Sequence, residues 1–227
     1  FFKFSKGPIF ANIILADEIN RTPPKTQAAL LEAMQEFEVT YSGNTYNLDR
    51  PFFILATQNP IEQSGTFPLP EAQQDRFLFY IKIGYPTASE ETTILKATTG
   101  TKSQKPSKII SAEEIIRLQE LVREVPISDD LISFVSNIVR ATRPETTTNN
   151  YVKEWVSWGA GPRAGQAIIV TAKARALMQG RLAVTPEDLK HVAYPVLRHR
   201  VIVNFRAEAE GITSDTVTEE LFKSIKL

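Results

Sequence analysis

The stretch IILADEIN, residues 13–20, decides the fold class. It begins as an uninterrupted apolar run, which is typical of a strand buried on both faces of a parallel sheet. Asp17 and Glu18 end the run, at the edge where open α/β sheets bind ligands. Asp17 suits Mg²⁺, held directly or through water, and Glu18 suits a base that orients and deprotonates water. The alternative is an acid pair that caps the following turn.

The rest of the first third alternates further strands with one helix. Residues 52–57 (FFILAT) and 77–83 (FLFYIKI) are predicted as a second and a third buried strand. Residues 25–36 have the apolar spacing of a helix, and residues 39–48 alternate around a Ser-Gly-Asn turn as a β-hairpin does. Buried strands separated by helices indicate an α/β fold with a parallel sheet.

After residue 85 the pattern becomes helical. Ser111 with Glu114 forms a capping box, and Ser128 starts another helical pattern. Residues 143–162 are rich in Pro, Thr, Asn and Gly and are predicted as a long connection, followed by helices at 163–179 and after Thr185. We therefore expect a partial α/β core over residues 1–85 and an all-α domain over residues 86–227.

Composition excludes several classes of protein. The 227 residues include 26 basic and 26 acidic side chains, so no overall charge attracts nucleic acid or an anionic membrane. There are no cysteines and only two histidines, which excludes disulfide scaffolds, thiolate metal sites and histidine-rich metal sites. No apolar run reaches the ~18 residues of a membrane span. The opening FFKFSKGPIF resembles neither a signal peptide nor a natural N-terminus and indicates a start partway through a longer protein.

Three further polar residues are candidates for the same chemistry. Asn59 ends the strand in FILATQNP and could hydrogen-bond a water or a phosphate, because its amide donates and accepts; the alternative is an Asn-Pro turn. Arg76, in EAQQDRF, offers a permanently charged guanidinium to phosphate oxygens; the alternative is a local pair with Asp75 or Glu71.

Arg163, in GAGPRAGQ, starts a helix of the second domain. The glycines before it suit a hinge that moves the charge. The alternative is that Arg163 packs on Trp155 or Trp158.

Several of these segments, in the same order, closely resemble the MoxR family of AAA+ ATPases, from about residue 7 to residue 199. They are ILADEINR, PKTQAALLEAMQE, FILATQNP, PLPEAQQDRF, GAGPRA and VTPEDLKHVAYPVLRHR. The resemblance implies part of a P-loop NTPase core with a parallel sheet, followed by a helical lid. It also implies ATP and Mg²⁺ as ligands.

The resemblance assigns a role to each candidate. Asp17 and Glu18 resemble the Walker B pair, with Asp17 on Mg²⁺ and Glu18 as the catalytic base. Asn59 resembles sensor 1, Arg76 an arginine finger that reaches the neighbouring subunit's site, and Arg163 sensor 2 over the subunit's own nucleotide. The 39–48 hairpin resembles one that faces the ring pore, and Arg21, which also could face a neighbour, has an open role.

One family motif does not occur: the sequence contains no G-x-x-x-x-G-K-[ST] loop. In the family this loop lies upstream of the stretch that the chain resembles, and its backbone N–H groups and lysine hold the ATP phosphates. We therefore expect the 227 residues alone to bind ATP poorly and to be inactive.

The resemblance further implies a cytoplasmic hexameric ring that remodels or matures client proteins, with a von Willebrand factor A domain protein as a partner. Three other functions stay open: a chelatase-type motor subunit, an ATP-independent protein-binding scaffold, and a nucleic-acid motor. The last would use a local patch of Arg175, Arg181, Arg198 and Arg200, which we interpret instead as solvated helix faces and lid contacts. Both histidines, His191 and His199, are interpreted as structural.

Overall fold

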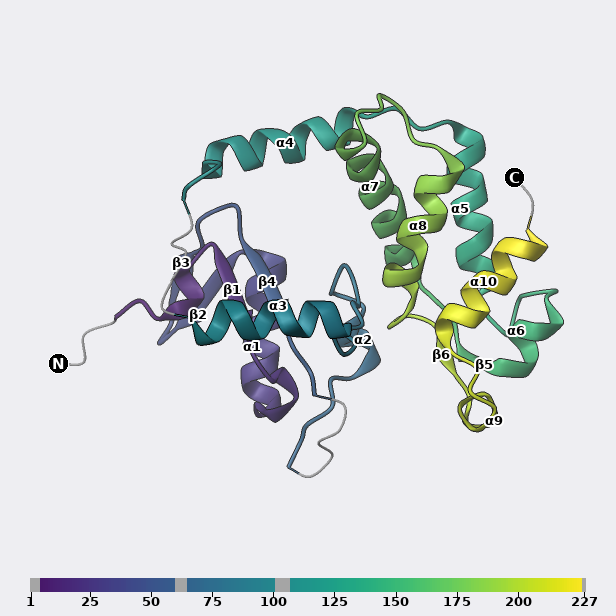
Figure 1. The fold of residues 1–227 in the computed structure, drawn as a ribbon, viewed down its shortest axis with the longest axis horizontal. Helices are drawn as coiled ribbons and strands as arrows, with labels where there is room; N and C mark the ends of the chain where they lie inside the picture. Colours follow the sequence, from purple (N-terminus) through teal and green to yellow (C-terminus); the bar gives the residue numbers. More distant parts are fainter. Residues whose placement is uncertain (1–4, 60–64, 101–106, 226–227) are drawn as a thin grey trace.

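The structure, a computed structural model, describes residues 5–59, 65–100 and 107–225. A region of short strands holds the N-terminal part of the chain, and a helical bundle holds the C-terminal part (Figure 1). The helix α4 (Ala112–Glu124) runs from the side of the strand region to the bundle, where it packs on α7 (Pro162–Met178).

The strand region is built on one parallel pair. β1 (Ile13–Ala16) and β4 (Phe53–Ala56) pair in register from Ile13 opposite Phe53 to Ala16 opposite Ala56. Between them the chain forms α1 (Pro24–Glu36) and an antiparallel hairpin of β2 (Glu38–Tyr41) and β3 (Asn44–Asn47). The parallel pair, the helix and the hairpin confirm the predictions made for this part of the chain.

Only one face of the parallel pair is well covered. Leu31 of α1 is fully buried with Ile19 and Leu69, and Ala56 packs against this cluster. On the opposite face the four apolar side chains stay 47–65% exposed: Ile13, Leu15, Phe53 and Leu55. The prediction of strands buried on both faces is therefore wrong for the described residues, because α1 covers a single face.

Residues 77–83 do not form the predicted third strand. Their backbone is bonded instead to the end of α8 (Pro186–Leu197), where the Tyr80 N–H donates to the carbonyl oxygen of Pro195 at 2.8 Å. The last carbonyls of a helix have no partner within the helix, so they are available to such a segment. Ile83 is 92% exposed, and the expected burial is absent as well.

The helical bundle has one large core. Fully or almost fully buried side chains from four helices meet in it: Ile138, Ile168, Leu197 and Leu221. They come from α5 (Asp129–Ala141), α7, α8 and α10 (Ser214–Ser224).

The capping signals at Ser111, Ser128 and Thr185 coincide with the starts of α4, α5 and α8. The predicted connection at 143–162 is more ordered than expected, because it contains α6 (Asn150–Trp155) and β5 (Val156–Trp158). β5 pairs with β6 (Ile202–Val203), an antiparallel contact between distant segments that local composition does not reveal.

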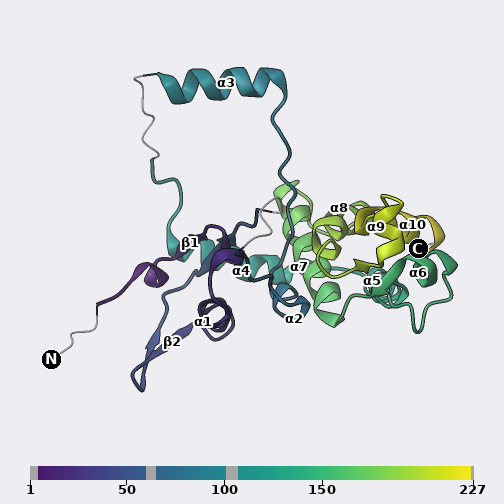
Figure 2. The ribbon, with the colours of Figure 1, turned by 90° about the horizontal axis from the view of Figure 1, so that it is seen from below.

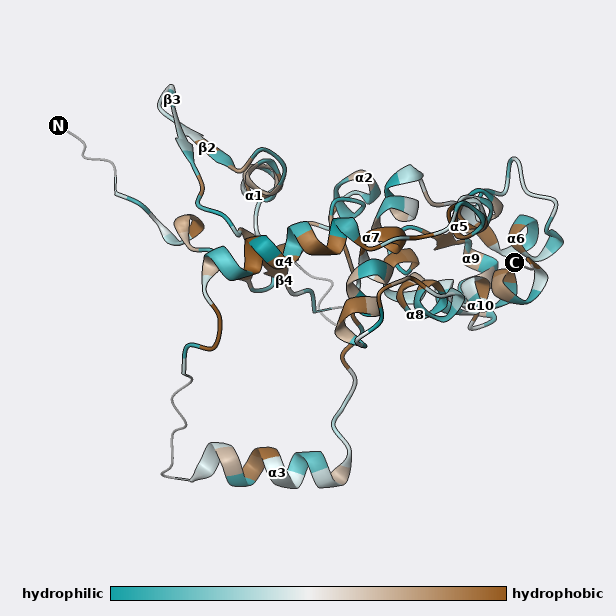
Figure 3. Cartoon of the chain, turned by 90° about the horizontal axis from the view of Figure 1, so that it is seen from above, coloured by the Kyte–Doolittle hydropathy of each residue, from teal (hydrophilic) through white to brown (hydrophobic). Residues whose placement is uncertain are grey.

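The remaining described elements are short, apart from α3. They are η1 (Pro8–Phe10), η2 (Ile19–Arg21), α2 (Glu71–Gln74), α3 (Ala88–Thr99) and α9 (Phe205–Ala209). In Figures 2 and 3 α3 lies apart from both regions, and all of its residues are exposed. Its start is fixed by a capping box between Thr87 and Glu90, a signal that the sequence contains.

Candidate functional site

Two acids and a threonine meet where β1 and β4 end. Asp17 follows β1 and Thr57 follows β4, so the in-register pairing of Ala16 with Ala56 sets them side by side. The Thr57 hydroxyl donates to Asp17 Oδ1 at 2.5 Å and accepts from the Glu18 backbone N–H at 2.8 Å. Thr57 thereby orients one carboxylate oxygen of Asp17, whose side chain is exposed.

Glu18 leaves the strand direction in a left-handed backbone conformation, with φ 49° and ψ 50°. Residues other than glycine adopt this region seldom, and such positions cluster at functional sites. The conformation is held on both sides, because Thr57 N–H donates to the Ala16 carbonyl and Ile19 N–H donates to the Thr57 carbonyl, each at 3.0 Å. The backbone of Glu18 therefore has its position set by the sheet rather than by a loose turn.

The Glu18 carboxylate makes an ion pair with Arg21 at 3.2 Å, with both side chains 40–50% exposed. Glu18 precedes η2 but makes no side-chain capping bond there. The turn-capping alternative for the acid pair therefore has no support in the described contacts. Asn59 lies two residues beyond Thr57, at the same edge of the sheet, and is half-buried.

Arg76 lies just after α2, on the connection that leads toward the bundle, and its side chain is exposed. Among the described residues it makes neither an ion pair nor a side-chain hydrogen bond, so the local pair with Asp75 or Glu71 does not form. Asp75 is instead occupied by two arginines of the bundle. Arg163 Nη1 lies 3.5 Å from Asp75 Oδ2, and Arg200 Nε lies 2.7 Å from Asp75 Oδ1.

Arg163 is placed at the N-terminal end of α7 by a tightly held turn. An added Cβ on Gly159 would lie 2.5 Å from the Thr142 carbonyl oxygen, so only glycine fits. Ala160 is buried, its N–H donates to Thr142 Oγ1 at 2.8 Å, and its carbonyl accepts from Arg143 Nε at 3.0 Å. The turn is therefore fixed to the end of α5 at Gly159 and Ala160, whereas a Cβ added to Gly161 would meet nothing within 4 Å, and the hinge stays a prediction.

Arg200 and His199 join the bundle to residues 75–78. Arg200 is 6% exposed, and its guanidinium donates to five acceptors: Asp75 Oδ1 and the carbonyls of Asp75, Phe77, Leu78 and Val196. His199 Nε2 lies 3.0 Å from the Phe77 carbonyl, so Nε2 carries the proton and donates. Burial, and next the charge of Arg200, lower the pKa of His199 to about 4. The structural role expected for His199 agrees with these contacts.

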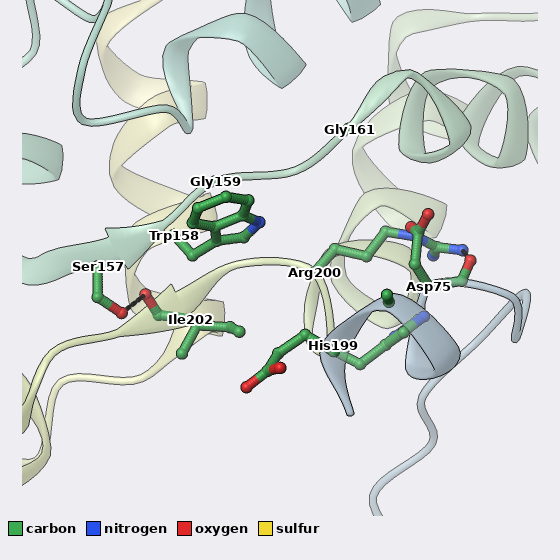
Figure 4. Close-up of a pocket in the computed structure, with 10 residues that line it drawn as sticks. Asp75, Ser157, Trp158, Gly159, Gly161, His199, Arg200 and Ile202 are labelled. Carbon is green, nitrogen blue, oxygen red and sulfur yellow. Dashed lines mark hydrogen bonds and ion pairs between the residues drawn. The ribbon is translucent and has the colours of Figure 1, made fainter. Parts of the chain in front are cut away.

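A cavity of about 590 Å³ lies between α2 and the bundle. Figure 4 shows Arg200 reaching Asp75 on one side of this cavity and Trp158 on another. The cavity is also lined by Glu71 and Ala72 of α2 and by Gly161, two residues before Arg163.

The described contacts do not join the two arginine candidates to the acid pair. Asp17, Glu18, Thr57 and Asn59 share one edge of the sheet, whereas Arg76 and Arg163 lie together at the end of α2, linked through Asp75. Sequence reasoning did not single out Thr57 or Asp75. Thr57 could have been found from its place opposite Asp17 in the two strands.

The four arginines considered as a basic patch are engaged in ion pairs. Arg175 and Arg181 both bind the fully buried Asp188, at 2.6 Å and 2.5 Å. Arg198 binds Asp215 at 2.8 Å, and Arg200 binds Asp75. Each of the four side chains is therefore bound to an aspartate within the fold, which gives the nucleic-acid alternative no support.

Mg²⁺ fits the acid pair in one particular mode. Among the described residues no three Asp, Glu, His or Cys side chains gather into a group that could hold a metal. Mg²⁺ commonly uses one or two protein carboxylates together with waters and substrate phosphates. Asp17, exposed and oriented by Thr57, suits that mode. As for membranes, the helices that the structure describes include none with the length and hydropathy to cross one.

Comparisons with known proteins agree with this geometry. The sequence pattern of the ATPase family associated with various cellular activities (AAA) matches residues 1–79, and that of the AAA lid domain matches residues 149–221. Chaperone MoxR1 of Mycobacterium tuberculosis is 44% identical over 222 residues, which are 97% of this chain and 59% of that protein. YeaC of Bacillus subtilis, an uncharacterised protein, is 41% identical over 227 residues, which are 100% of this chain and 68% of YeaC.

This chain belongs to the MoxR family of AAA+ ATPases. A crystal structure of a candidate ATPase from Cytophaga hutchinsonii shares the fold, with a TM-score of 0.92 and 42% identity over 98% of this chain and 68% of that one. The MoxR assignment confirms the resemblance, and the α/β core with a helical lid is confirmed as the fold class.

The chelatase branch is represented by a more distant relative. A magnesium-chelatase subunit homologue from Methanocaldococcus jannaschii is 25% identical over 201 residues. The MoxR relatives above are much more similar, so the chelatase alternative is the weaker one.

Proposed function

We propose that this MoxR-family chain carries the hydrolytic residues of an ATP-driven, chaperone-like machine that remodels or matures client proteins. The observation that carries the proposal is the arrangement of Asp17, Thr57 and Glu18 at the carboxyl edge of a parallel strand pair. Two carboxylates there, one oriented by a hydroxyl and the other held out by its backbone, suit two different tasks in phosphoryl transfer.

Glu18 is the proposed base. In the reaction, a water oxygen bonds to the terminal phosphorus of ATP while the bond from that phosphorus to the bridging oxygen of ADP breaks. Glu18 takes the proton that the water loses. Its carboxylate forms an ion pair with Arg21 at 3.2 Å. Asn59, at the same edge, would hydrogen-bond the water or the terminal phosphate.

Asp17 is the proposed residue for Mg²⁺, directly or through water, and the ion when bound would neutralise charge that develops on the phosphate oxygens. Arg76 would do the same in the neighbouring subunit's site, which its exposure at the end of α2 permits. Arg163 would contact the subunit's own nucleotide. An arginine finger in related reactions is worth ~10³–10⁵ in rate, so a lone subunit would be almost inactive.

The activity is proposed for the complete protein. The chain spans 59% of the length of MoxR1 and 68% of YeaC. It contains no phosphate-binding G-x-x-x-x-G-K-[ST] motif, so tight ATP binding needs residues beyond these 227.

Assembly and partners belong to the same proposal. AAA+ proteins typically form oligomers, and a hexameric ring would place Arg76 of one subunit against the next subunit's site. The proposal also includes a client protein, a partner with a von Willebrand factor A domain, and the cytoplasm as the location. An ATP-independent scaffold is the competing function. It has in its favour the exposed apolar face of β1 and β4, which could bind protein.

The test replaces Glu18 with Gln in the full-length protein, which keeps the side-chain shape and removes the base. ATP turnover should fall ~10²–10⁴-fold while ATP still binds. Glu32→Gln, the same change at an exposed position of α1, serves as the matched control and should leave turnover unchanged. Turnover of Glu18→Gln within threefold of the control would remove Glu18 as the base, and absence of ATP turnover in the parent would favour the scaffold.

A further inference from the structure

Asp75 is the one described residue that forms an ion pair with Arg163, and it directly precedes Arg76. Its two carboxylate oxygens are divided between two arginines of the bundle. Oδ1 binds Arg200 at 2.7 Å and Oδ2 binds Arg163 at 3.5 Å. A single side chain thus joins the arginine proposed for the subunit's own nucleotide to the segment that presents the arginine proposed for the neighbour.

The two arginines differ in how firmly they are held. The side chain of Arg200 is 3% exposed and uses its five N–H donors on five acceptors, so it has no donor left for another anion. The side chain of Arg163 is 52% exposed and makes one longer contact. Exposed pairs are weak and exchange readily. Arg200 is therefore the fixed partner of Asp75, and Arg163 is the partner that can leave.

We infer that Asp75 is a positioning residue that competes with the nucleotide for Arg163 and thereby links a subunit's own site to the finger that it presents to its neighbour. This inference rests on the proposed function. A terminal phosphate carries more charge than one carboxylate and attracts the same guanidinium. When ATP draws Arg163 away, Asp75 keeps only Arg200, and the segment 75–76 loses one of its two attachments to the bundle. ADP, which lacks that phosphate, leaves Arg163 on Asp75.

The first experiment measures nucleotide affinity by calorimetry in the full-length protein, with Glu18→Gln present so that ATP is not consumed. Asp75→Asn removes the competing charge and should tighten ATP binding about two- to fivefold, the range of one exposed ion pair, without changing ADP binding. In a protein that also carries Arg163→Gln, Asp75→Asn should have no effect on ATP binding.

Asp215→Asn is the matched control. Asp215 also has a side chain 27% exposed and binds one exposed and one shielded cation, Lys82 at 3.2 Å and Arg198 at 2.8 Å. It holds the same connection to the bundle but does not contact Arg163, so its ATP and ADP affinities should equal those of the parent. A purely structural role for Asp75 would change both nucleotides alike and would be matched by Asp215→Asn.

A second variant covers the case in which Asp75→Asn does not fold. Ala72→Asp adds an exposed carboxylate one turn before Asp75, on the wall of the same cavity. It should weaken ATP binding about twofold and leave ADP binding unchanged.

The experiments distinguish a wrong role for Arg163 from a wrong role for Asp75. If Arg163→Gln leaves the ratio of ATP to ADP affinity unchanged, the proposed role of Arg163 is wrong. If Arg163→Gln changes the ratio while Asp75→Asn and Ala72→Asp do not, Asp75 does not compete for Arg163 and the inference alone is overturned. Where competition holds, Asp75→Asn in the background with an intact Glu18 should also lower the Hill coefficient of ATP turnover. An unchanged coefficient would overturn the link to the neighbour.

Discussion

Replacing Arg200 with Lys tests how the lid is attached to the core. Arg200 donates five hydrogen bonds, four of them to backbone carbonyls, whereas lysine has three donors on a point charge. At least two acceptors are therefore left without Arg200. A buried acceptor without a partner costs about 1–3 kcal/mol, so two of them would lower the free energy of unfolding by about 2–6 kcal/mol. Where Phe77 is one of the two, His199 remains as its donor and a single acceptor is left, so the expected loss of stability is about 1–3 kcal/mol.

The assay is urea unfolding followed by tryptophan fluorescence. The chain has two tryptophans, Trp155 and Trp158, and both lie in the helical region beside β6, so the signal reports on the lid. The midpoint should move to lower urea with little change in slope.

Arg198→Lys is the matched control for Arg200→Lys. Arg198 also binds an aspartate and the carbonyl of Tyr80, but its side chain is 21% exposed and Lys82 shares its partner Asp215. The Arg198→Lys change should lower the free energy of unfolding by less than about 1 kcal/mol. Equal effects of the two changes, or a loss below 1 kcal/mol for Arg200→Lys, would refute the conclusion that Arg200 attaches the lid.

Two further predictions concern pH and assembly. The folded state holds the pKa of His199 near 4, below about 6.5 in the unfolded chain, so its contribution to stability is complete above pH 6.5 and is lost as the pH falls toward 4. We expect unfolding measured as a function of pH to show a loss of stability of up to about 3 kcal/mol. The loss should disappear in His199→Gln but remain in His191→Gln, the same change at an exposed histidine. Equal pH profiles for the two variants would contradict this prediction. Rings mixed from full-length Arg76→Ala and Glu18→Gln subunits should recover part of the ATP turnover that each lacks alone, because some interfaces then have both residues intact. Absence of recovery in rings shown by mass to be mixed would indicate that Arg76 acts within its own subunit.

The sequence predicted the parts of the site that depend on local pattern. An apolar run followed by two acids has few structural solutions, so the place of Asp17 and Glu18 at a strand end followed directly, and β4 placed Asn59 at the same edge. The capping residues at Ser111, Ser128 and Thr185 likewise act within four residues of themselves.

The predictions that were wrong depend on contacts between residues that are distant in the sequence. Residues 77–83 have the composition of a buried strand, but the end of α8 binds their backbone, and nothing local distinguishes the two outcomes. Arg200 and Asp75 are 125 residues apart, so no periodicity reveals their pair. The left-handed conformation of Glu18 depends on Thr57 in the same way. The start of α3 is different, because the capping box of Thr87 and Glu90 is local and can be read from the sequence, although no helix start was predicted there.

The turn before Arg163 has a mechanical consequence. Because Gly159 and Ala160 are fixed to the end of α5, a pull on Arg163 that Gly161 does not absorb would rotate α7 together with its neighbours. The 17 residues of α7 form a rod about 26 Å long. A rotation of roughly 10° about the Arg163 end would carry the far end of that rod through about 4–5 Å, by the same helix geometry. The lid would then act as a lever arm, with a small displacement at the phosphate becoming a stroke at the opposite end of the bundle.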